Sequence, residues 1–542
     1  MKSKDEMSTF TETIMRQKYA QAGENWPDIG RRSTKYVFGA VDTKKSLIEQ
    51  TTQYIAERKF IPGGRYLYAA GRPYHQINNC LLMRAEDSRE GWAELMQHCT
   101  MGLMTGAGIG VDYSAIRPEG KPIRKTGGFA TGPLALMQMV NEAGRGVQQG
   151  GSRRSALWAG LKWNHSDIMK FIVMKNWIQE VRDLKARDFN FPATMDGTNV
   201  SVQLDDEFFE KFAAEDSQAE QVYWTTIERM LRTGEPGFSI DCGRNKKETL
   251  RNACTELTSA DDSDVCNLGS INLARIESLE EMRAVVECAT AFLLAGTVYS
   301  DVPYAKVDMV RTKNRRLGLG LMGIHEWLLI HGKRYGIDAD LDKYLAEYAK
   351  SGNFANSYAD EWDLSHPLKT RAIAPVGTIG IIGETSTGVE PILCVAYKRR
   401  YLKGNTWNYQ YVLDPTAKRL IEEKGVDPDS IEDAYVLAED VERRLAFQAH
   451  VQTFVDHAIS STINLPQWGS EFNNKGTVQK MGKMIMKYLS QLRGLTAYPD
   501  GSRSGQPLSP VRWATAMKHQ GEIFIEQADI CEISGKGGTC GS

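Results

Sequence analysis

The sequence has no excess of charge of either sign and no long hydrophobic run. Its 542 residues carry 66 Lys and Arg against 68 Asp and Glu, for a formal net charge of -2. This balance gives no general attraction to nucleic acid or to an anionic membrane, so we expect neither as a partner. The start of the chain holds no apolar core of signal-peptide length, and the longest apolar run, ATAFLLAGTVYS, is too short to span a bilayer. We therefore expect a cytoplasmic protein, or one of the host cytoplasm if its source is viral.

Cysteine is sparse and scattered. The nine cysteines include neither a CxxC pair nor a Cys/His cluster. An odd, dispersed set without a secretory signal argues against a disulfide framework, and the missing clusters argue against a structural zinc site or other protein-held metal. The histidines are also scattered, and we interpret His165 and His457 as structural. The GxxxxGK pattern followed by Ser or Thr is absent, which excludes the P-loop NTPases. Any special cysteine should therefore act chemically.

Glycines and short apolar runs divide the chain. Residues up to about Phe60 are charged and helix-like, and glycine becomes dense between Ile61 and Arg154. Periodicity predicts helices at LALMQMVNEAG, LEEMRAVVECATAFLLAGTVYS, DKYLAEYAKSGNFANSYADEW and ERRLAFQAHVQTFVDHAIS, and strands at GVDYS, NVSVQL and IAPVGTIGIIGETSTG. This mixture favours an α/β fold whose loops carry the function. We expect a helical segment 1–60, a main domain 61–510 and a C-terminal segment 511–542 with a mobile tail.

Three glycine-rich motifs carry weaker signals. GLGLMG, at Gly318–Gly323, has dinucleotide-fingerprint spacing, but it opens a run typical of a packed helix, so we prefer close helix packing. GAGIG, at Gly106–Gly110, indicates a tight backbone path rather than a phosphate loop. GETSTGVEP, at Gly383–Pro391, places consecutive hydroxyls between glycines, just after the apolar IGII. That pattern fits an anion-binding nest at a strand-to-helix turn and, equally, a capped helix N-terminus.

The segment Asn252-Ala253-Cys254-Thr255-Glu256 carries the clearest chemistry. If it is extended, the side chains of Asn252, Cys254 and Glu256 share one face. A neighbouring carboxylate raises the pKa of a thiol, which is unfavourable for a thiolate nucleophile. The same neighbours suit a thiol that gives up a hydrogen atom while the carboxylate handles a proton. For so short a pattern, a loop cysteine beside a solvated glutamate is the alternative.

This segment, with Val265-Cys266-Asn267-Leu268-Gly269-Ser270 behind it, resembles the finger-loop region of ribonucleotide reductase catalytic chains. Asn78-Asn79-Cys80 is similar to the family's first redox cysteine. From about Ile61 onward, further segments match in the family's order: DYSAIRPEGKPI, GGFATGP, GGSRRSALWAGLKWNHSDIMKFI, TGEPGFSI, NRRLGLGLMG, APVGTIGIIGETSTGVEP and AISSTINLP. The resemblance implies a ten-stranded α/β barrel of two antiparallel half-barrels with a central finger loop, plus N-terminal helices and a flexible C-terminal tail.

The resemblance also implies roles for individual residues. Cys254 would become a thiyl radical and abstract the ribose 3′ hydrogen, Glu256 would take the 3′-hydroxyl proton, and Asn252 would hydrogen-bond the sugar. Cys80 and Cys266 would protonate the leaving 2′-hydroxyl and supply reducing equivalents, ending as a disulfide. A thioredoxin-like donor would reduce that disulfide through the tail residues Cys531 and Cys540. The family's tail cysteines usually sit closer together than these two.

The nucleotide contacts expected here follow from the same resemblance. The substrate phosphates would lie on the turn made by Glu384, Thr385, Ser386, Thr387 and Gly388. The loop ARDFNFPATMDGTN, with Arg187, Asn190 and Asn199, would lie between the substrate base and a dNTP or ATP specificity effector. Diphosphate and triphosphate substrates both stay open, as do a monomer and a homodimer.

One tyrosine bears on the source of the radical. The oxygen-dependent class relays its radical through two adjacent tyrosines near the C-terminus, whereas here Tyr498 is followed by Pro499. This resembles the adenosylcobalamin-dependent class, so adenosylcobalamin is the expected cofactor. Ala253 and Thr255 replace the Pro and Gly that usually flank the radical cysteine in that class. The alternatives are a catalytic subunit served by a separate metal-containing radical subunit, and a nucleotide-binding relative without catalysis.

Overall fold

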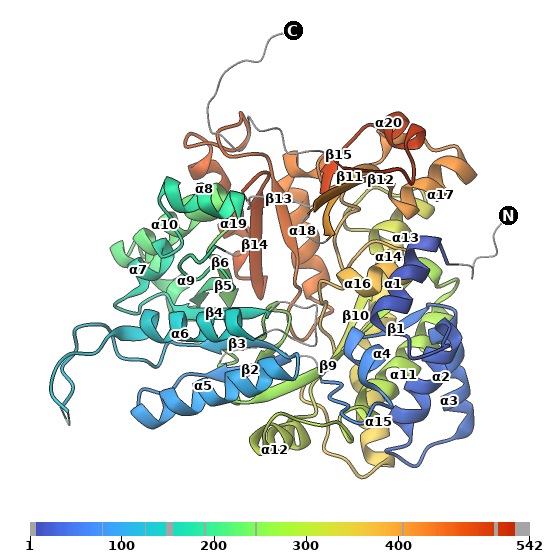
Figure 1. The fold of residues 1–542 in the computed structure, drawn as a ribbon, viewed down its shortest axis with the longest axis horizontal. Helices are drawn as coiled ribbons and strands as arrows, with labels where there is room; N and C mark the ends of the chain where they lie inside the picture. Colours follow the sequence, from blue (N-terminus) through green and yellow to red (C-terminus); the bar gives the residue numbers. More distant parts are fainter. Residues whose placement is uncertain are drawn as a thin grey trace, which may run out of the picture.

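The computed structural model describes residues 7–78, 80–124, 126–147, 155–188, 191–243, 247–403, 406–502 and 508–525. Within them the strands form three sheets (Figure 1). The largest has ten strands: β1 (Phe60–Pro62), β2 (Cys80–Arg84), β3 (Gly108–Asp112), β4 (Leu157–Lys162), β5 (Thr198–Leu204), β6 (Gly237–Ile240), β9 (Asp264–Asn272), β10 (Leu317–Met322), β13 (Thr462–Leu465) and β14 (Gly494–Pro499). A second sheet contains β11 (Ala396–Lys403), β12 (Thr406–Leu413), β15 (Leu508–Pro510) and β16 (Ile523–Phe524). The third is a hairpin of β7 (Leu250–Arg251) and β8 (Thr258–Ser259).

Helices surround the large sheet (Figure 1). The first half of the chain supplies α1 (Thr9–Lys18), α2 (Trp26–Phe38), α3 (Lys45–Ala56), α4 (Gly64–Ala69), α5 (Arg89–Met104), α6 (Gly132–Gly146), α7 (Ile168–Val173), α8 (Gln179–Arg187), α9 (Asp206–Ala213) and α10 (Ser217–Thr233). The second half supplies α11 (Leu279–Ala295), α12 (Ala305–Asn314), α13 (Ile324–Ile330), α14 (Ala339–Ala349), α15 (Ser351–Glu361), α16 (Gly377–Gly383), α17 (Pro415–Lys424), α18 (Val441–Gln452), α19 (Val478–Leu489) and α20 (Trp513–Lys518). Local signals start several of them; α2, for example, begins with a reciprocal capping box between Asn25 and Asp28.

The large sheet contains blocks of opposite direction. Strands β2 to β6 are parallel, and the direction reverses on both sides of them, at β2/β9 and at β6/β14. The outer pairs β9/β10 and β13/β14 are again parallel. Between β10 and β13 the described residues show only isolated bridges, Leu319 with Arg371 and Ile373 with Ile459. The fold is thus mixed α/β with a ten-stranded sheet, and its closure into a barrel stays a prediction.

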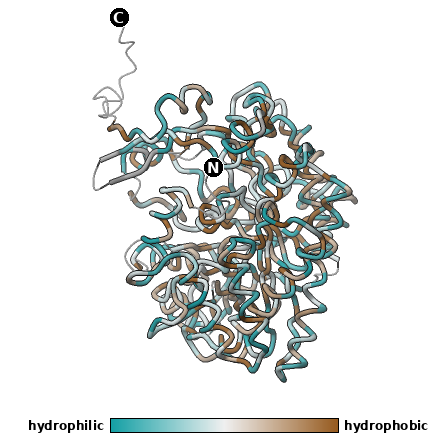
Figure 2. Tube along the Cα trace, turned by 90° about the vertical axis from the view of Figure 1, so that its right-hand side faces the viewer, coloured by the Kyte–Doolittle hydropathy of each residue, from teal (hydrophilic) through white to brown (hydrophobic). Residues whose placement is uncertain are grey.

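Two hydrophobic cores hold the helices against this sheet. One joins α2, α3 and α11 to β1, β9 and β10, and the other joins α5, α6 and α10 to the parallel strands and β14. The central strands are buried at nearly every residue, as expected for parallel strands covered by helices. Figure 2 shows hydrophobic stretches, in brown, alternating with hydrophilic ones along the whole chain trace. In the described part of the chain, no helix is both long and apolar enough to cross a membrane.

Most of the predicted elements are confirmed, including α6, α11, α18 and β5. One prediction was wrong and another was correct only in part. IGII lies in helix α16, not in a strand. GLGLMG itself forms the buried strand β10, and the packed helix expected in the run that it opens is α13 (Ile324–Ile330). Short apolar runs do not distinguish strand from helix by periodicity. In β10, glycine serves a close backbone approach, because a Cβ at Gly320 would lie 2.8 Å from the carbonyl oxygen of Ala372. The domain boundaries stay a prediction.

Candidate active site

Residues Asn252–Glu256 form the tip of the β7–β8 hairpin, whose ladder has two residue pairs. The Thr255 N–H donates to the Asn252 carbonyl at 3.1 Å, and Thr255 adopts a φ of +67°. The side-chain oxygen of Asn252 accepts the Leu257 N–H at 3.0 Å. The extended conformation on which the shared face depended is not the one found, because a turn closed by the Asn252 side chain forms the tip.

Two glycines of β3 make room for this hairpin. A Cβ at Gly110 would lie 1.9 Å from the carbonyl oxygen of Arg251. A Cβ at Gly108 would lie 3.1 Å from the Cβ of Ala253 and 3.4 Å from the Sγ of Cys80. Glycine in a strand often marks such a close backbone approach. The close backbone packing predicted for GAGIG is confirmed, and the segment that packs against its glycines is the β7–β8 hairpin.

Cys80 begins β2 beside the hairpin tip and is a buried free thiol. In the antiparallel ladder between β2 and β9 it stands directly opposite Cys266, of which only the backbone is described. The Cα atoms of directly opposed residues lie about 4.5–5.5 Å apart, which is within the span of a disulfide. The sheet register thus brings the two predicted redox cysteines to neighbouring positions.

Burial and a shared carboxylate set the protonation of the tip. Burial, and then the Glu256 carboxylate, raise the pKa of Cys80 to about 12. The same two effects raise the pKa of Cys254 well above its usual value. Burial raises the pKa of Glu256 to about 7, partly opposed by polar contacts with its own backbone and with Asn252. At neutral pH both cysteines are therefore thiols, and Glu256 titrates far closer to neutrality than an exposed glutamate.

The tip also buries polar atoms that have no hydrogen-bond partner in the described part of the chain. They are Nδ2 of Asn252 and Oε2 of Glu256. Both side chains are buried, whereas Cys254 keeps partial solvent access. Buried polar atoms without a partner are rare in native proteins and call for an explanation. A bound ligand would supply one, because the tip offers it a donor, an acceptor and a thiol together.

Comparison with known proteins places this arrangement in a family. Residues 78–225, 214–348 and 368–498 match the family described as ribonucleotide reductase, barrel domain. The chain belongs to this family. All five predicted residues of the hairpin and the two ladder strands, Cys80, Asn252, Cys254, Glu256 and Cys266, lie in the matched stretches.

Named relatives extend over most of the chain. A vitamin B12-dependent ribonucleoside-diphosphate reductase of Thermoplasma acidophilum is 24% identical over 88% of this chain and 68% of its own length. A protein of the same name from Mycobacterium tuberculosis strain CDC 1551 is 25% identical over 93% of this chain and 81% of its own length. The ribonucleoside-diphosphate reductase large chain of Schizosaccharomyces pombe is 26% identical over 51% of this chain and 40% of its own length.

The turn expected to hold the substrate phosphates follows a helix instead of preceding one. Helix α16 ends at Gly383, and Glu384 adopts a φ of +50° at its C-cap. The Glu384 carboxylate pairs with Arg58 at 3.0 Å, and the Thr385 hydroxyl donates to Glu326 at 2.5 Å. The predicted strand-to-helix turn and the predicted N-terminal cap were therefore both wrong. The N–H groups that α16 leaves free lie at its other end, and phosphate contact by residues 384–388 stays a prediction.

The expected specificity loop is described in part. Arg187 ends α8 and Asn199 lies on β5, both exposed. Asn190 lies outside the described residues, as do the tail residues Cys531 and Cys540. A cavity of about 460 Å³ is lined by α6, by the segment leading into α8 and by Pro192–Thr194. The loop thus borders a space large enough for a small ligand.

Tyr498 and the histidines have structural surroundings. Tyr498, on β14, packs against Gly234, where a Cβ would lie 2.2 Å from its ring. His165 Nε2 lies 2.8 Å from the carbonyl oxygen of Ile116, and His457 Nδ1 accepts the Thr258 N–H at 3.1 Å. These contacts support a structural interpretation of His165, whereas Nε2 of His457 is buried without a hydrogen-bond partner in the described part of the chain, so the interpretation of His457 stays a prediction. Among the residues that the structure describes, no group of His, Cys, Asp and Glu side chains could hold a metal ion.

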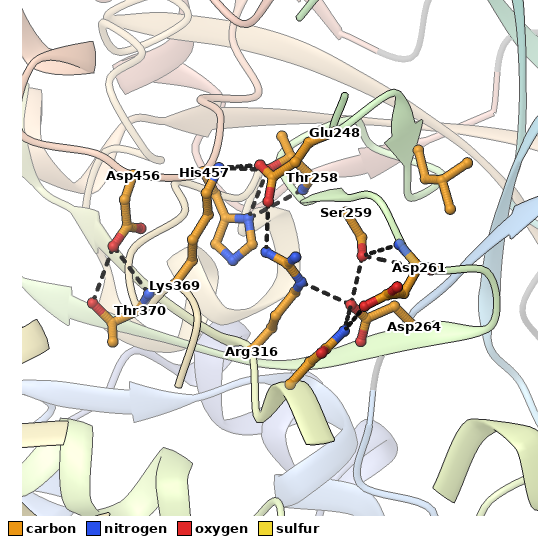
Figure 3. Close-up of polar contacts among 12 residues, drawn as sticks. Glu248, Thr258, Ser259, Asp261, Asp264, Arg316, Lys369, Thr370, Asp456 and His457 are labelled. Carbon is orange, nitrogen blue, oxygen red and sulfur yellow. Dashed lines mark hydrogen bonds and ion pairs between the residues drawn. The ribbon is translucent and has the colours of Figure 1, made fainter. Parts of the chain in front are cut away.

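Sequence reasoning missed a set of mostly buried charged and polar side chains at the base of the hairpin (Figure 3). Glu248, Arg316, Lys369 and His457 come from distant parts of the chain and meet beside β8. No local motif connects them. Only long-range pairing of β9, β10 and the segments near residues 371 and 458 brings them together.

Proposed function

We propose that the chain is a ribonucleotide reductase catalytic chain, which converts ribonucleotides to 2′-deoxyribonucleotides by thiyl-radical chemistry at Cys254 for DNA precursor synthesis. Family membership supports the reaction class. The observation that carries the site is the hairpin tip, where a neutral thiol lies with an unpaired amide and an unpaired carboxylate oxygen.

The protonation states fit the roles proposed for the tip. A neutral thiol at Cys254 can lose a hydrogen atom, and the resulting thiyl radical abstracts the 3′ hydrogen of the ribose. Glu256, with a pKa of about 7, accepts the proton of the 3′-hydroxyl as general base. The amide of Asn252 donates its free N–H to a sugar oxygen, which satisfies an atom otherwise buried without a partner.

Reduction needs two electrons and two protons, and the Cys80–Cys266 pair supplies them. One thiol of this pair protonates the 2′-hydroxyl, which leaves as water, and the two thiols end as a disulfide. Cys254 then returns the hydrogen atom to C3′, and its thiyl radical re-forms. Their opposed positions in the β2/β9 ladder support this pairing. A thioredoxin-like donor returns the pair to thiols by exchange through Cys531 and Cys540.

Adenosylcobalamin is the proposed radical source, since two relatives carry vitamin B12 in their names and Tyr498 is followed by Pro499. When bound, this cofactor supplies a carbon radical that can take a hydrogen atom from a thiol. Cys254 fits that chemistry, because burial and the Glu256 carboxylate keep it a neutral thiol with a hydrogen atom to give. The chain's own part is to hold Cys254 there and to keep water from Asn252 and Glu256.

Other partners follow from the proposed reaction. The ribonucleotide places its phosphates near residues 384–388, and a dNTP or ATP effector binds beside the loop that carries Arg187, Asn190 and Asn199. The cavity of about 460 Å³ next to this loop supports an effector there. A cytoplasmic location suits the nucleotide substrates, and the chain acts as a monomer or a homodimer.

The test is ribonucleotide reduction by the purified protein with dithiothreitol, without oxygen, with and without adenosylcobalamin. Ribonucleoside diphosphates and triphosphates are assayed separately. We expect deoxyribonucleotide only in the presence of the cofactor. Failure with both substrate classes and with the cofactor would remove the cobalamin assignment.

A catalytic subunit that depends on a separate metal-containing radical subunit is the second candidate. Thr255 beside Cys254 favours it, because threonine at this position resembles the two-subunit enzymes. The Schizosaccharomyces pombe relative is named as a large chain. Activity that appears only when a metalloprotein is added to the same assay would establish this candidate in place of the first.

A further inference from the structure

The two strands of the β7–β8 hairpin, which we call the finger hairpin, end in a cluster of mostly buried charged and polar side chains, the anchor cluster: Glu248, Thr258, Arg316, Lys369 and His457 (Figure 3). Glu248 precedes β7, and Thr258 lies on β8. Arg316 directly precedes β10, Lys369 lies just before the bridge residue Arg371, and His457 lies just before the bridge residue Ile459. The cluster therefore ties both strands of the hairpin to the surrounding sheet.

Lys369 bridges the two hairpin strands directly. Its ammonium group donates to Glu248 Oε2 and, at 3.0 Å, to Thr258 Oγ1. Thr258 Oγ1 in turn donates to Glu248 Oε2 at 2.8 Å. The Lys369 side chain is 12% exposed and that of Glu248 is 16% exposed, so solvent screens this pair little.

The remaining members connect this bridge to the sheet and to the tip. Arg316 lies 3.1 Å from the second oxygen of Glu248 and 2.7 Å from Asp264 on β9. His457 accepts the Thr258 N–H at 3.1 Å through Nδ1. The residue after it, Ala458, donates its N–H to the carbonyl of Glu256 at 2.8 Å. One continuous set of contacts thus runs from β9 to the backbone of the proposed general base.

The hairpin needs such support. A two-stranded hairpin is marginally stable by itself in water, and this one has only two ladder pairs. Catalytic groups must be held closely, since a misplacement of about 1 Å can cost roughly 100-fold in rate. Gly110 fixes where the hairpin lies on β3, but it leaves the two strand ends to be held by side chains.

We propose that Lys369 is a positioning residue, which holds Cys254 and Glu256 in place by joining Glu248 to Thr258 at the base of the hairpin. This inference rests on the proposed function, because it assigns Lys369 to the same reaction. Lys369 itself touches neither Cys254 nor Glu256 through any contact described above.

The protonation of Lys369 gives this role a signature. Burial lowers the pKa of Lys369 to about 8, while the Glu248 carboxylate opposes the shift. Arg316 lowers that pKa further, Asp456 raises it, and Lys369 in turn lowers the pKa of the buried His457. Above about pH 8 the ammonium loses its proton, and with it the ion pair to Glu248.

Stability and activity should respond oppositely in that range. Because the unfolded chain holds the Lys369 proton up to its usual pKa near 10.5, this group makes folding more favourable as pH rises from about 8. Positioning, in contrast, is lost as the ion pair is lost. We therefore expect kcat to fall above about pH 8 without unfolding.

The test compares Lys369→Met, Lys369→Arg and the double variant Glu248→Gln/Lys369→Met in the complete enzyme with adenosylcobalamin and dithiothreitol. Lys59→Met is the control, because Lys59 is also mostly buried and pairs with Glu57 and Glu281, outside the anchor cluster. We expect K369M to lower kcat by at least tenfold with KM within twofold. The double variant should recover thermal stability but not kcat, since it removes the Glu248 charge that K369M would leave mostly buried with Arg316 as its remaining cationic partner. K369R should keep its activity, and its kcat should no longer fall above about pH 8, because a guanidinium stays charged.

A second measurement does not need turnover. Hydrogen–deuterium exchange of the peptide 247–261 should be faster in K369M than in the wild-type protein and unchanged in K59M. Equal exchange in all three proteins, or a kcat of K369M that matches K59M, would overturn the proposal. A fall of kcat above about pH 8 that persists unchanged in K369R would do the same. If the wild-type protein itself reduces no ribonucleotide, the proposed function fails, and the exchange data alone decide whether Lys369 holds the hairpin.

Discussion

Replacing Gly110 by alanine should displace the finger hairpin while leaving its chemical groups unchanged. The added Cβ would lie 1.9 Å from the Arg251 carbonyl oxygen and 2.8 and 2.9 Å from the carbonyl carbons of Arg251 and Asn252. Contacts below 3.0 Å are not tolerated, and all three atoms belong to backbone, so the hairpin must move by about 1 Å. A displacement of this size at reacting groups costs roughly 100-fold in rate, and overpacking a core costs about 1–3 kcal/mol in stability.

The assay is steady-state ribonucleotide reduction, with the folded fraction followed by thermal unfolding. We expect Gly110→Ala to lower kcat by about 100-fold at a temperature where it remains folded. Gly108→Ala should be milder, because its Cβ would meet only side-chain atoms, at 3.1 and 3.4 Å. Gly146→Ala is the control, since no atom lies within 4 Å of its Cβ. If G110A keeps kcat within about threefold of G146A, the hairpin is not held against β3 as described.

Three further predictions concern charge and the radical path. The kcat/KM of the wild-type enzyme should rise through about pH 7 as Glu256 ionises. Glu256→Gln should abolish this pH dependence and lower the rate by at least about 100-fold. The raised pKa of Glu256 also means that the stability it contributes below about pH 4.5 is lost as pH rises through 7, which urea unfolding at several pH values would detect. Arg58→Met should destabilise the fold by about 3–5 kcal/mol, because it leaves the carboxylate of Glu384 buried without its ion pair; an unchanged urea midpoint would contradict this. Tyr498→Phe should keep kcat within about threefold, because the proposed radical does not pass through it, and a loss of 100-fold would point to a tyrosine relay.

Long periodic segments were predictable from the sequence, and short ones were not. The runs that became α6 and α11 are long enough for helical periodicity to show. Glycine-rich runs of four to six residues, such as those of β10 and α16, fit either state, and their neighbours in the sheet decided the outcome. The interpretation of GETSTGVEP as an anion-binding nest depended on the wrong choice for IGII, whereas the phosphate contact implied by the resemblance stays a prediction.

At the site, the sequence indicated which residues come together but not how. The alternation of Asn252, Cys254 and Glu256 singled out three residues that the hairpin tip does hold, but a turn rather than an extended strand brings them together. The positive φ of Thr255 leaves no mark in the sequence, since threonine rarely adopts it. The opposition of Cys80 and Cys266 depends on a long-range register, as does the meeting of Lys369 with Glu248, so no local pattern could have shown either.

The most direct test of the central claim is oxygen-free reduction of a ribonucleotide by Cys254→Ser, with adenosylcobalamin and dithiothreitol present. Cys242→Ser is the matched control, because Cys242 is also mostly buried and its Sγ contacts only the Ser490 carbonyl oxygen among its described hydrogen-bond partners. We predict wild-type turnover in Cys242→Ser and no deoxyribonucleotide above background in Cys254→Ser. Turnover in Cys254→Ser near the wild-type rate would contradict the assignment of the radical to Cys254, and with it the proposed mechanism.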